Sequence, residues 1–176
     1  MSTGAISQAA YDRIGGVMTR ALTGLSVDQL RRQPAGPESN PIGWMAWHLS
    51  RVHDTNFSNL LGQKQAWVAE GWHEKFGLSA ETGSGSGATL EEVRAFDPID
   101  AETVLGYWEA VRARSRALLD SITDADLDKP TPPRPNSTAR ETFQGTIARS
   151  TSDTFQHIGQ IAYARGLVDK HGWYDA

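Results

Sequence analysis

The sequence contains no cysteine. A chain without cysteine forms no disulfide, no thiolate metal site and no cysteine nucleophile, so any thiol chemistry would need an external thiol. Apolar runs are also short: none approaches the roughly 18 consecutive residues that a membrane span requires. Met1 to Ala9 carries neither the basic nor the apolar stretch of an export signal. We therefore expect a cytoplasmic protein with no membrane partner.

Positive charge is scarce and scattered. The 176 residues include 17 Lys and Arg against 21 Asp and Glu, which gives a formal net charge of -4 at pH 7. Such a chain repels a polyanion and lacks the basic stripe of a nucleic-acid-binding protein, so we exclude that class. Apolar residues make up 39% of the sequence and charged residues 22%, a composition typical of a globular protein. The length fits a single domain over residues 1–176.

Apolar side chains recur at helical spacing in four segments of the chain. The first spans about residues 5–24, where Gly24 would end a helix. The second is expected over about residues 41–61, because Asn40 can serve as N-cap and Pro41 fits the first turn.

The other two helical segments lie in the second half of the chain. Asp100 precedes a strongly periodic run that continues to Ile122, which predicts a third helix. Ser137 or Thr138 can cap a fourth helix that reaches about Gly166.

The connecting segments are long and contain few structural signals. Residues 67–76 fit either a short helix or a loop, and residues 77–87 are rich enough in Gly and Ser to predict a mobile loop. Residues 129–135 contain four prolines and predict a stiff connector. Because no alternating strand pattern occurs, we predict an all-α fold, a four-helix bundle with long loops. Residues 77–87 and 129–136 would border a site.

The fourth helix carries polar residues in the middle of its inward-facing stripe. That stripe can be followed through Phe143, Ile147, Ser150, Thr154, His157 and Ile161. Asp153 lies beside it, four residues before His157, so both side chains lie on one helical face. Buried polar groups are costly unless they are satisfied, which suggests that this space has an occupant.

His48 is the third candidate ligand. It lies between Met45 and Val52 on the apolar face of the second helix. Two histidines and a carboxylate from facing helices can bind one divalent ion and leave coordination positions open, as catalytic sites do. The spacing also fits a simpler interpretation, in which His48 is a hydrogen-bonded core residue and the carboxylate and imidazole of the last helix only stabilise that helix.

Two segments resemble signatures of the DinB/YfiT-like superfamily. One is the run PIGWMAWHL at residues 41–49, followed by Asp54, and the other extends from Asp153 through the run HIGQI at residues 157–161. The resemblance implies a four-helix bundle that holds a divalent ion, often zinc or nickel, through His48, Asp153 and His157. The commoner superfamily pattern has a histidine at the position of Asp153, whereas the mycothiol-dependent branch is similar to this chain in placing a carboxylate there.

The resemblance also implies an activity. The superfamily includes mycothiol-dependent maleylpyruvate isomerases and transferases that use low-molecular-weight thiols such as mycothiol or bacillithiol. We therefore expect a thiol S-transferase and a homodimer, with a small-molecule thiol and an electrophile as partners and a metal that activates the thiol. An isomerase is less expected, because those enzymes carry an additional C-terminal domain. The alternative is a non-enzymatic stress-response or ligand-binding protein with a structural or vestigial metal site.

Other histidine and tryptophan residues are interpreted as non-functional. His53 lies about 140° around the helix from the candidate ligand, too far to join the same ion, and is expected at the surface or rim. His73 and His171 are also expected to be rim or solvent-facing residues. Trp44 and Trp47 are expected to make core or dimer contacts.

Overall fold

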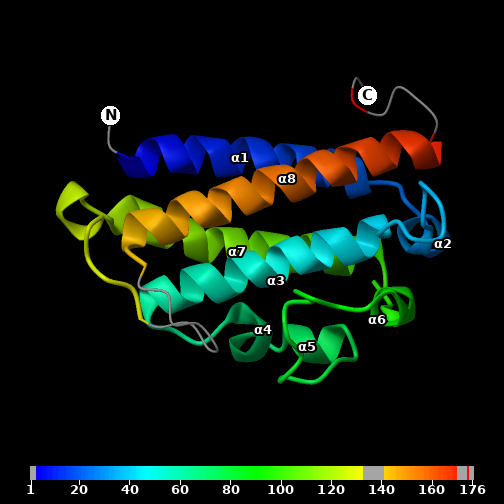
Figure 1. Ribbon diagram of the computed structural model, residues 1–176, viewed down its shortest axis with the longest axis horizontal. Coiled ribbons are helices and arrows are strands. Elements are labelled where there is room, and N and C mark those ends of the chain that lie inside the picture. The colour runs from blue at the N-terminus through cyan, green and yellow to red at the C-terminus, as the bar shows by residue number, and fades with distance from the viewer. Residues whose placement is uncertain (1–2, 133–140, 170–173, 175–176) are drawn as a thin grey trace.

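Four long helices form the body of the computed structural model, which describes residues 3–132, 141–169 and 174 (Figure 1). They are α1 (Thr3–Leu22), α3 (Ile42–Leu61), α7 (Ala101–Ser121) and α8 (Phe143–Asp169). Within the described residues, extended pairing is limited to one isolated bridge between Pro130 and Thr142. The prediction of an all-α four-helix bundle is confirmed. None of the helices in the described part of the chain is long and apolar enough to cross a membrane.

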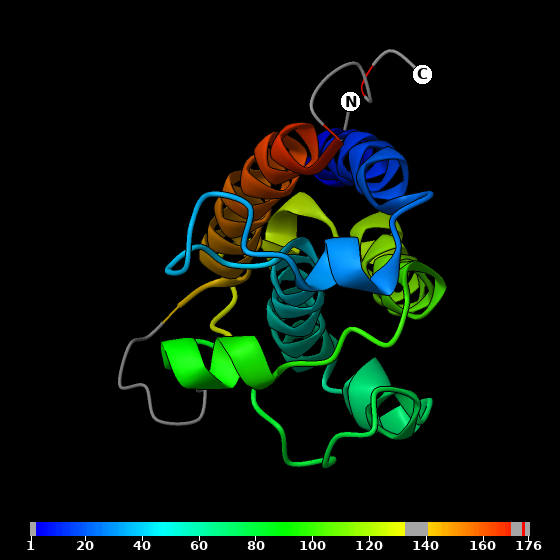
Figure 2. The same cartoon turned by 90° about the vertical axis from the view of Figure 1, so that its right-hand side faces the viewer.

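The long helices pack in a square around one apolar core. α3 packs against α7 and α8, and α1 packs against the same two helices from the opposite side, as the end-on view shows (Figure 2). α1 and α8 run in one direction, whereas α3 and α7 run in the other (Figure 1). Because α3 and α7 are parallel neighbours, the connection between them has to return along the length of the bundle before α7 begins.

Short helices occupy the connections in the described part of the chain. They are α2 (Val27–Arg31), α4 (Ala66–Ala69), α5 (Trp72–Lys75), α6 (Leu90–Ala95) and a 3-10 helix, η1 (Asp124–Asp126). Capping boxes begin three of them: Ser26 pairs with Gln29 at α2, Thr89 pairs with Glu92 at α6, and Thr123 pairs with Asp126 at η1. These capping patterns are visible in the sequence, but the helices that they start are too short to show an apolar period.

The starts of α7 and α3 follow from local chemistry. α7 begins after Asp100, whose side chain accepts a hydrogen bond from the Thr103 N–H, as a cap at that position predicts. α3 begins at Ile42, because Pro41 has an extended backbone (φ -66, ψ 150) and itself occupies the N-cap position. Asn40 is therefore not the cap, and the prediction for that residue is wrong by one position.

The last helix, α8, begins later than predicted. It spans Phe143–Asp169, so it extends slightly beyond the expected end near Gly166. Ser137 and Thr138, the expected caps, lie outside the described residues.

Although α3 is one corner of the square, almost none of its sides faces solvent. Of its 20 residues, 16 are buried, because α7 and α8 flank it and α2 and α4 pack against it as well. His53 is completely buried, with an exposed fraction of 0%. The prediction of a rim position for His53 is therefore wrong: a rotation of about 140° from His48 leads into the core.

His53 makes a polar contact at the centre of the bundle. Its Nε2 lies 2.6 Å from Ser115 Oγ, and that hydroxyl donates to the Val111 carbonyl, so His53 Nε2 is the donor toward Ser115. The ring stacks on Phe57 with centroids 4.3 Å apart. Burial lowers the pKa of His53 from 6.5 to about 3, because the protonated ring has no access to water.

We expect mild acid to lower the free energy of unfolding of the metal-free protein, because the buried His53 cannot bind a proton in the folded state. The unfolded chain binds a proton on this imidazole below about pH 6.5, whereas the folded protein keeps the ring neutral down to about pH 3. Stability is therefore lost as the pH falls through this window, by about 2 kcal/mol between pH 6.5 and pH 5. Urea unfolding at both pH values tests this, because His53→Gln should lose that part of the pH dependence. An unchanged dependence in the variant would contradict the assignment.

Candidate metal centre

The antiparallel helices α3 and α8 pack against each other, and the three predicted ligands lie where the two helices meet. We call this line of contact the seam. The imidazole rings of His48 and His157 meet edge to face, with centroids 4.8 Å apart and planes at 83°. Asp153 Oδ1 lies 3.7 Å from His157 Nε2. Two ligand atoms bound about 2.1 Å from one ion stand at most about 4.2 Å apart. The carboxylate and the imidazole of α8 are therefore close enough to share an ion.

Both histidines have one ring nitrogen hydrogen-bonded to an oxygen. His48 Nδ1 lies 2.6 Å from the Ser84 carbonyl oxygen, and His157 Nδ1 lies 2.9 Å from Gln160 Oε1. A carbonyl oxygen only accepts, so each neutral ring carries its proton on Nδ1 and its lone pair on Nε2. Histidines that bind metals in proteins have this arrangement, with the second nitrogen donating to an oxygen.

The environment of His48 favours the neutral ring. Burial lowers the pKa of His48 from 6.5, the Ser84 carbonyl opposes that shift, and the neighbouring His157 adds to it. A neutral imidazole is the form that coordinates a metal ion.

Asp153 presents a carboxylate oxygen without a partner. Its Oδ2 is buried and accepts no hydrogen bond, although 33% of the side chain is exposed. Buried carboxylate oxygens are normally paired with a donor or a cation. The residues present therefore fit a divalent cation, which would use this oxygen together with the two free Nε2 lone pairs.

The site lies at the edge of the bundle rather than in its middle. His48 is 7% exposed, but the His157 side chain is 18% exposed. The other polar residues of the stripe, Ser150 and Thr154, are buried, and Thr154 Oγ1 donates to the Ser150 carbonyl at 2.7 Å. Ser150 Oγ lies 3.4 Å from His53 Nδ1, so the unpaired oxygen beside the stripe is the one on Asp153, and the predicted occupant of this space stays a prediction.

The three side chains are close together but do not form a finished site. Among the residues that the structure describes, no group of three or more His, Asp or Glu side chains is placed so that it could hold a metal ion as it stands. Binding requires side-chain rotation at the seam, for which the partial exposure of Asp153 and His157 leaves room. The assignment of His48, Asp153 and His157 as ligands stays a prediction.

The Gly- and Ser-rich segment 77–87 lies against this seam. It has no regular secondary structure, as predicted, yet it is attached to α3 at two points. The Ser84 carbonyl accepts from His48, and the Thr82 carbonyl accepts from Arg51 Nη2 at 2.7 Å. Trp44 stacks on the His48 ring with centroids 4.8 Å apart and planes at 4°. The loop and the indole together fix the position of the imidazole.

The described part of the second loop that was expected to border the site lies elsewhere. The described part of residues 129–136 ends at Pro132, whose carbonyl accepts from Asn59 Nδ2 at 3.2 Å. Asn59 follows His48 by eleven residues, which corresponds to about 16 Å along the helix. Because α7 runs in the same direction as α3, its connection to α8 starts at the far end of the bundle. The described part of this connector therefore does not border His48.

Comparison with known proteins identifies the family of this bundle. A family model described as the DinB superfamily matches residues 10–161, which is most of the chain. The chain belongs to the DinB superfamily. A conserved protein from Enterococcus faecalis has a similar crystal structure, with a TM-score of 0.84 and 25% sequence identity over 97% of this chain and 99% of that chain. No curated protein matches the sequence. The predicted superfamily is therefore confirmed, and neither match names an activity.

Asp54, the acidic residue of the DinB-like segment, holds the fold together. Its Oδ1 accepts from Ser58 Oγ and from the Ala66 N–H, and its Oδ2 accepts from the Trp67 N–H and from the Tyr107 hydroxyl, at 2.8 to 2.9 Å. Burial raises the pKa of Tyr107 well above 10, and the charge of Asp54 raises it further, so the phenol remains a donor. The sequence pattern around Asp54 does not indicate this structural role.

Two cavities flank the segment 77–87 in this DinB-superfamily fold. A cavity of about 450 Å³ has Trp44, Trp47 and Phe96 among its walls, and one of about 790 Å³ has Arg51 and Ser84 among its walls. The two indoles are core residues, as predicted, with exposed fractions of 7% and 3%. They also form a cavity wall beside His48, a role that their sequence pattern allowed but did not favour over core contacts.

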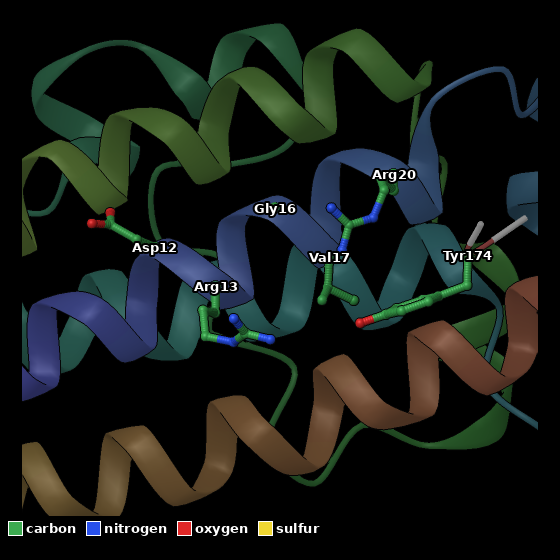
Figure 3. Close-up of a pocket in the computed structure, with 6 residues that line it drawn as sticks. All are labelled: Asp12, Arg13, Gly16, Val17, Arg20 and Tyr174. Carbon is green, nitrogen blue, oxygen red and sulfur yellow. The ribbon is translucent and has the colours of Figure 1, made fainter. Parts of the chain in front are cut away.

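A further cavity, of about 490 Å³, lies on α1 (Figure 3). Its lining residues are Asp12, Arg13, Gly16, Val17, Arg20 and Tyr174. The guanidinium carbon of Arg20 lies 5.2 Å from the centre of the Tyr174 ring. α1 lies diagonally across the bundle from α3 (Figure 2), so this cavity does not adjoin the candidate metal centre.

The remaining histidines lie away from the seam or outside the described residues. His73 is half-buried beside Trp67, with ring centroids 6.4 Å apart, which agrees with the predicted rim position. His171 lies outside the described residues.

Proposed function

We propose that this DinB-superfamily chain binds one divalent metal ion through His48, Asp153 and His157 and transfers an external low-molecular-weight thiol to an electrophile. The observation that carries the proposal is a pair of imidazoles, each with Nδ1 engaged by an oxygen, beside a buried carboxylate oxygen without a partner. Each donor has an unused lone pair at the same seam. A divalent cation is the class of ligand that satisfies all three together.

Two imidazoles and one carboxylate suit zinc, nickel, iron and cobalt, of which the superfamily resemblance favours zinc or nickel, and they leave positions for a substrate. When bound, such an ion lowers the pKa of a coordinated thiol, so the thiol is present as thiolate at neutral pH. The chain contributes the orientation of His48, because the Ser84 carbonyl holds that ring, whereas Asp153 and His157 would rotate to complete the site. Since the chain has no cysteine, the thiol has to come from a small molecule such as mycothiol or bacillithiol.

Two cavities lie against the loop that contacts His48 and would give a thiol and an electrophile room near the seam, although none of the three candidate ligands is among their lining residues. The cavity of about 790 Å³ offers Lys64 and the hydroxyl of Thr55 to a polar thiol. The cavity of about 450 Å³ offers the aromatic walls formed by Trp44 and Trp47 to an apolar electrophile.

One observation favours the alternative function, a non-enzymatic stress-response or ligand-binding protein with a structural or vestigial metal site. Within the described ranges, no three potential ligands stand ready to hold an ion without rearrangement. A site that has lost its catalytic use would keep the residues and lose the preorganised geometry that catalysis needs.

Metal content and thiol consumption test the two functions in sequence. Protein purified without a metal-affinity tag should contain about one equivalent of a transition metal, directly or after reconstitution. The loaded protein should then consume mycothiol or bacillithiol in the presence of 1-chloro-2,4-dinitrobenzene, and chelator-treated protein should not. Metal binding without thiol consumption would favour the alternative. If the protein binds no metal even after reconstitution, the proposal of a metal centre is wrong.

A further inference from the structure

The glycine loop, residues 83–87 with the sequence Gly-Ser-Gly-Ser-Gly, lies between the two cavities beside the candidate metal centre. Gly83 lines both cavities, so open space lies on either side of this short segment. The loop nevertheless makes a close contact with α3, because the Ser84 carbonyl oxygen lies 2.6 Å from His48 Nδ1. Composition alone predicts flexibility for such a run. Its contacts instead make it part of the support of a candidate ligand.

Gly85 makes this close contact possible. Its φ of +84° lies in the left-handed region that favours glycine. A Cβ at this position would stand 2.9 Å from Cζ3 of Trp47, 3.1 Å from Cζ2 of Trp44 and 3.3 Å from Nδ1 of His48. Both indoles are buried and rigid, so they cannot move aside as a flexible side chain would. Any larger residue at position 85 therefore has to move the loop away from the ring.

The start of the loop is fixed to the same helix that carries His48. The Thr82 carbonyl accepts from Arg51 Nη2, and Arg51 lies three residues after His48 on α3. The guanidinium is itself held over the Trp67 ring at 4.4 Å and donates to Gln65 Oε1. The Ser84 carbonyl is therefore placed relative to His48 by a rigid part of α3.

We propose that Gly85 is a positioning residue for His48: its lack of a side chain lets the Ser84 carbonyl reach Nδ1, which holds the ring proton there and leaves Nε2 free for a metal ion. This inference rests on the proposed function, because the orientation of the His48 ring matters only if His48 binds a metal ion. The protonated nitrogen of the free protein can be determined without any metal.

The test compares Gly85→Ala with Gly87→Ala. Gly87 also has a left-handed backbone, with φ +79°, but a Cβ there would meet nothing within 4 Å. Both variants share the backbone strain, and only Gly85→Ala disturbs the contact with His48. Nitrogen-15 chemical shifts of the metal-free protein should place the His48 proton on Nδ1 in the wild type and in Gly87→Ala. In Gly85→Ala the proton should shift toward Nε2.

Zinc affinity is the second readout. Loss of an oxygen partner of a metal-binding histidine should weaken zinc binding about 10- to 100-fold in Gly85→Ala, against no more than about twofold in Gly87→Ala.

The outcomes separate this inference from the proposed function. A wild-type His48 with its proton on Nε2, or equal ring shifts in the two glycine variants, would overturn the role of Gly85. The wild-type shifts decide the question even if Gly85→Ala fails to fold. Correct ring shifts in a protein that binds no zinc would instead remove the metal centre and leave the hydrogen-bond geometry intact.

Discussion

Alanine in place of His157 is expected to remove the metal ion from the protein. His157 and Asp153 lie on one face of α8, with Nε2 and Oδ1 3.7 Å apart, so loss of the imidazole leaves one carboxylate facing His48 across the seam. Two ligands do not make a stable site for a transition metal. We expect affinity to fall by more than the roughly 10- to 100-fold that is typical for a lost outer partner. Elemental analysis after dialysis should find about one equivalent in the wild type and none in the variant.

Metal-linked stability gives an independent measure of the same variant. An ion that binds only the folded protein stabilises it by about 4 kcal/mol at a thousandfold excess over Kd. The wild type should gain this stability on addition of zinc, and His157→Ala should not. The control is His73→Ala, which removes a half-buried histidine beside Trp67, away from the seam, and should keep both the metal and the stabilisation. A full equivalent of metal in His157→Ala would show that the ligand assignment is wrong.

The bundle could be predicted because its four long helices have long apolar periods. α1, α3 and α7 lie within a few residues of the predicted ranges, and α8 differs mainly at its start. The proximity of His48 to His157 also follows from pattern, since each lies on a helix face that contacts the other helix. The single-domain organisation, the homodimer, the cytoplasmic location and the thiol partner stay predictions.

Contacts made by the main chain could not be predicted. The Ser84 carbonyl that holds His48 belongs to a run whose composition indicates flexibility, and nothing in its side chains marks the contact. His53 was misplaced because helical spacing locates a residue around a helix but does not show how many sides of that helix are covered. Since α3 is covered on nearly all sides, its polar residues His53 and Asp54 lie in the core.

Substitution of Asp54 by asparagine is expected to destabilise the protein more than any other single change considered. Asp54 is 1% exposed and accepts four hydrogen bonds, and the guanidinium of Arg51 lies 3.9 Å from its Oδ2. An asparagine would present an amide N–H₂ to donors and leave the buried Arg51 without its opposite charge. Loss of one partner of a buried charge pair costs about 3–5 kcal/mol. For a chain of this size the melting temperature should fall on the order of 10 °C.

The matched control for this change is Asp12→Asn on α1. Asp12 also pairs with arginines, at 3.0 Å from Arg116 and 3.8 Å from Arg112, but 44% of its side chain is exposed. Solvent-exposed pairs contribute at most about 1 kcal/mol, so this variant should melt close to the wild type. A similar fall in melting temperature in the two variants would mean that Asp54 contributes no more to stability than an exposed charge does. A large loss of stability confined to Asp54→Asn would show that the Asp54 carboxylate stabilises the packing of α3 against α4 and α7. It would also show that Asp54 keeps Arg51 in place to donate to the Thr82 carbonyl.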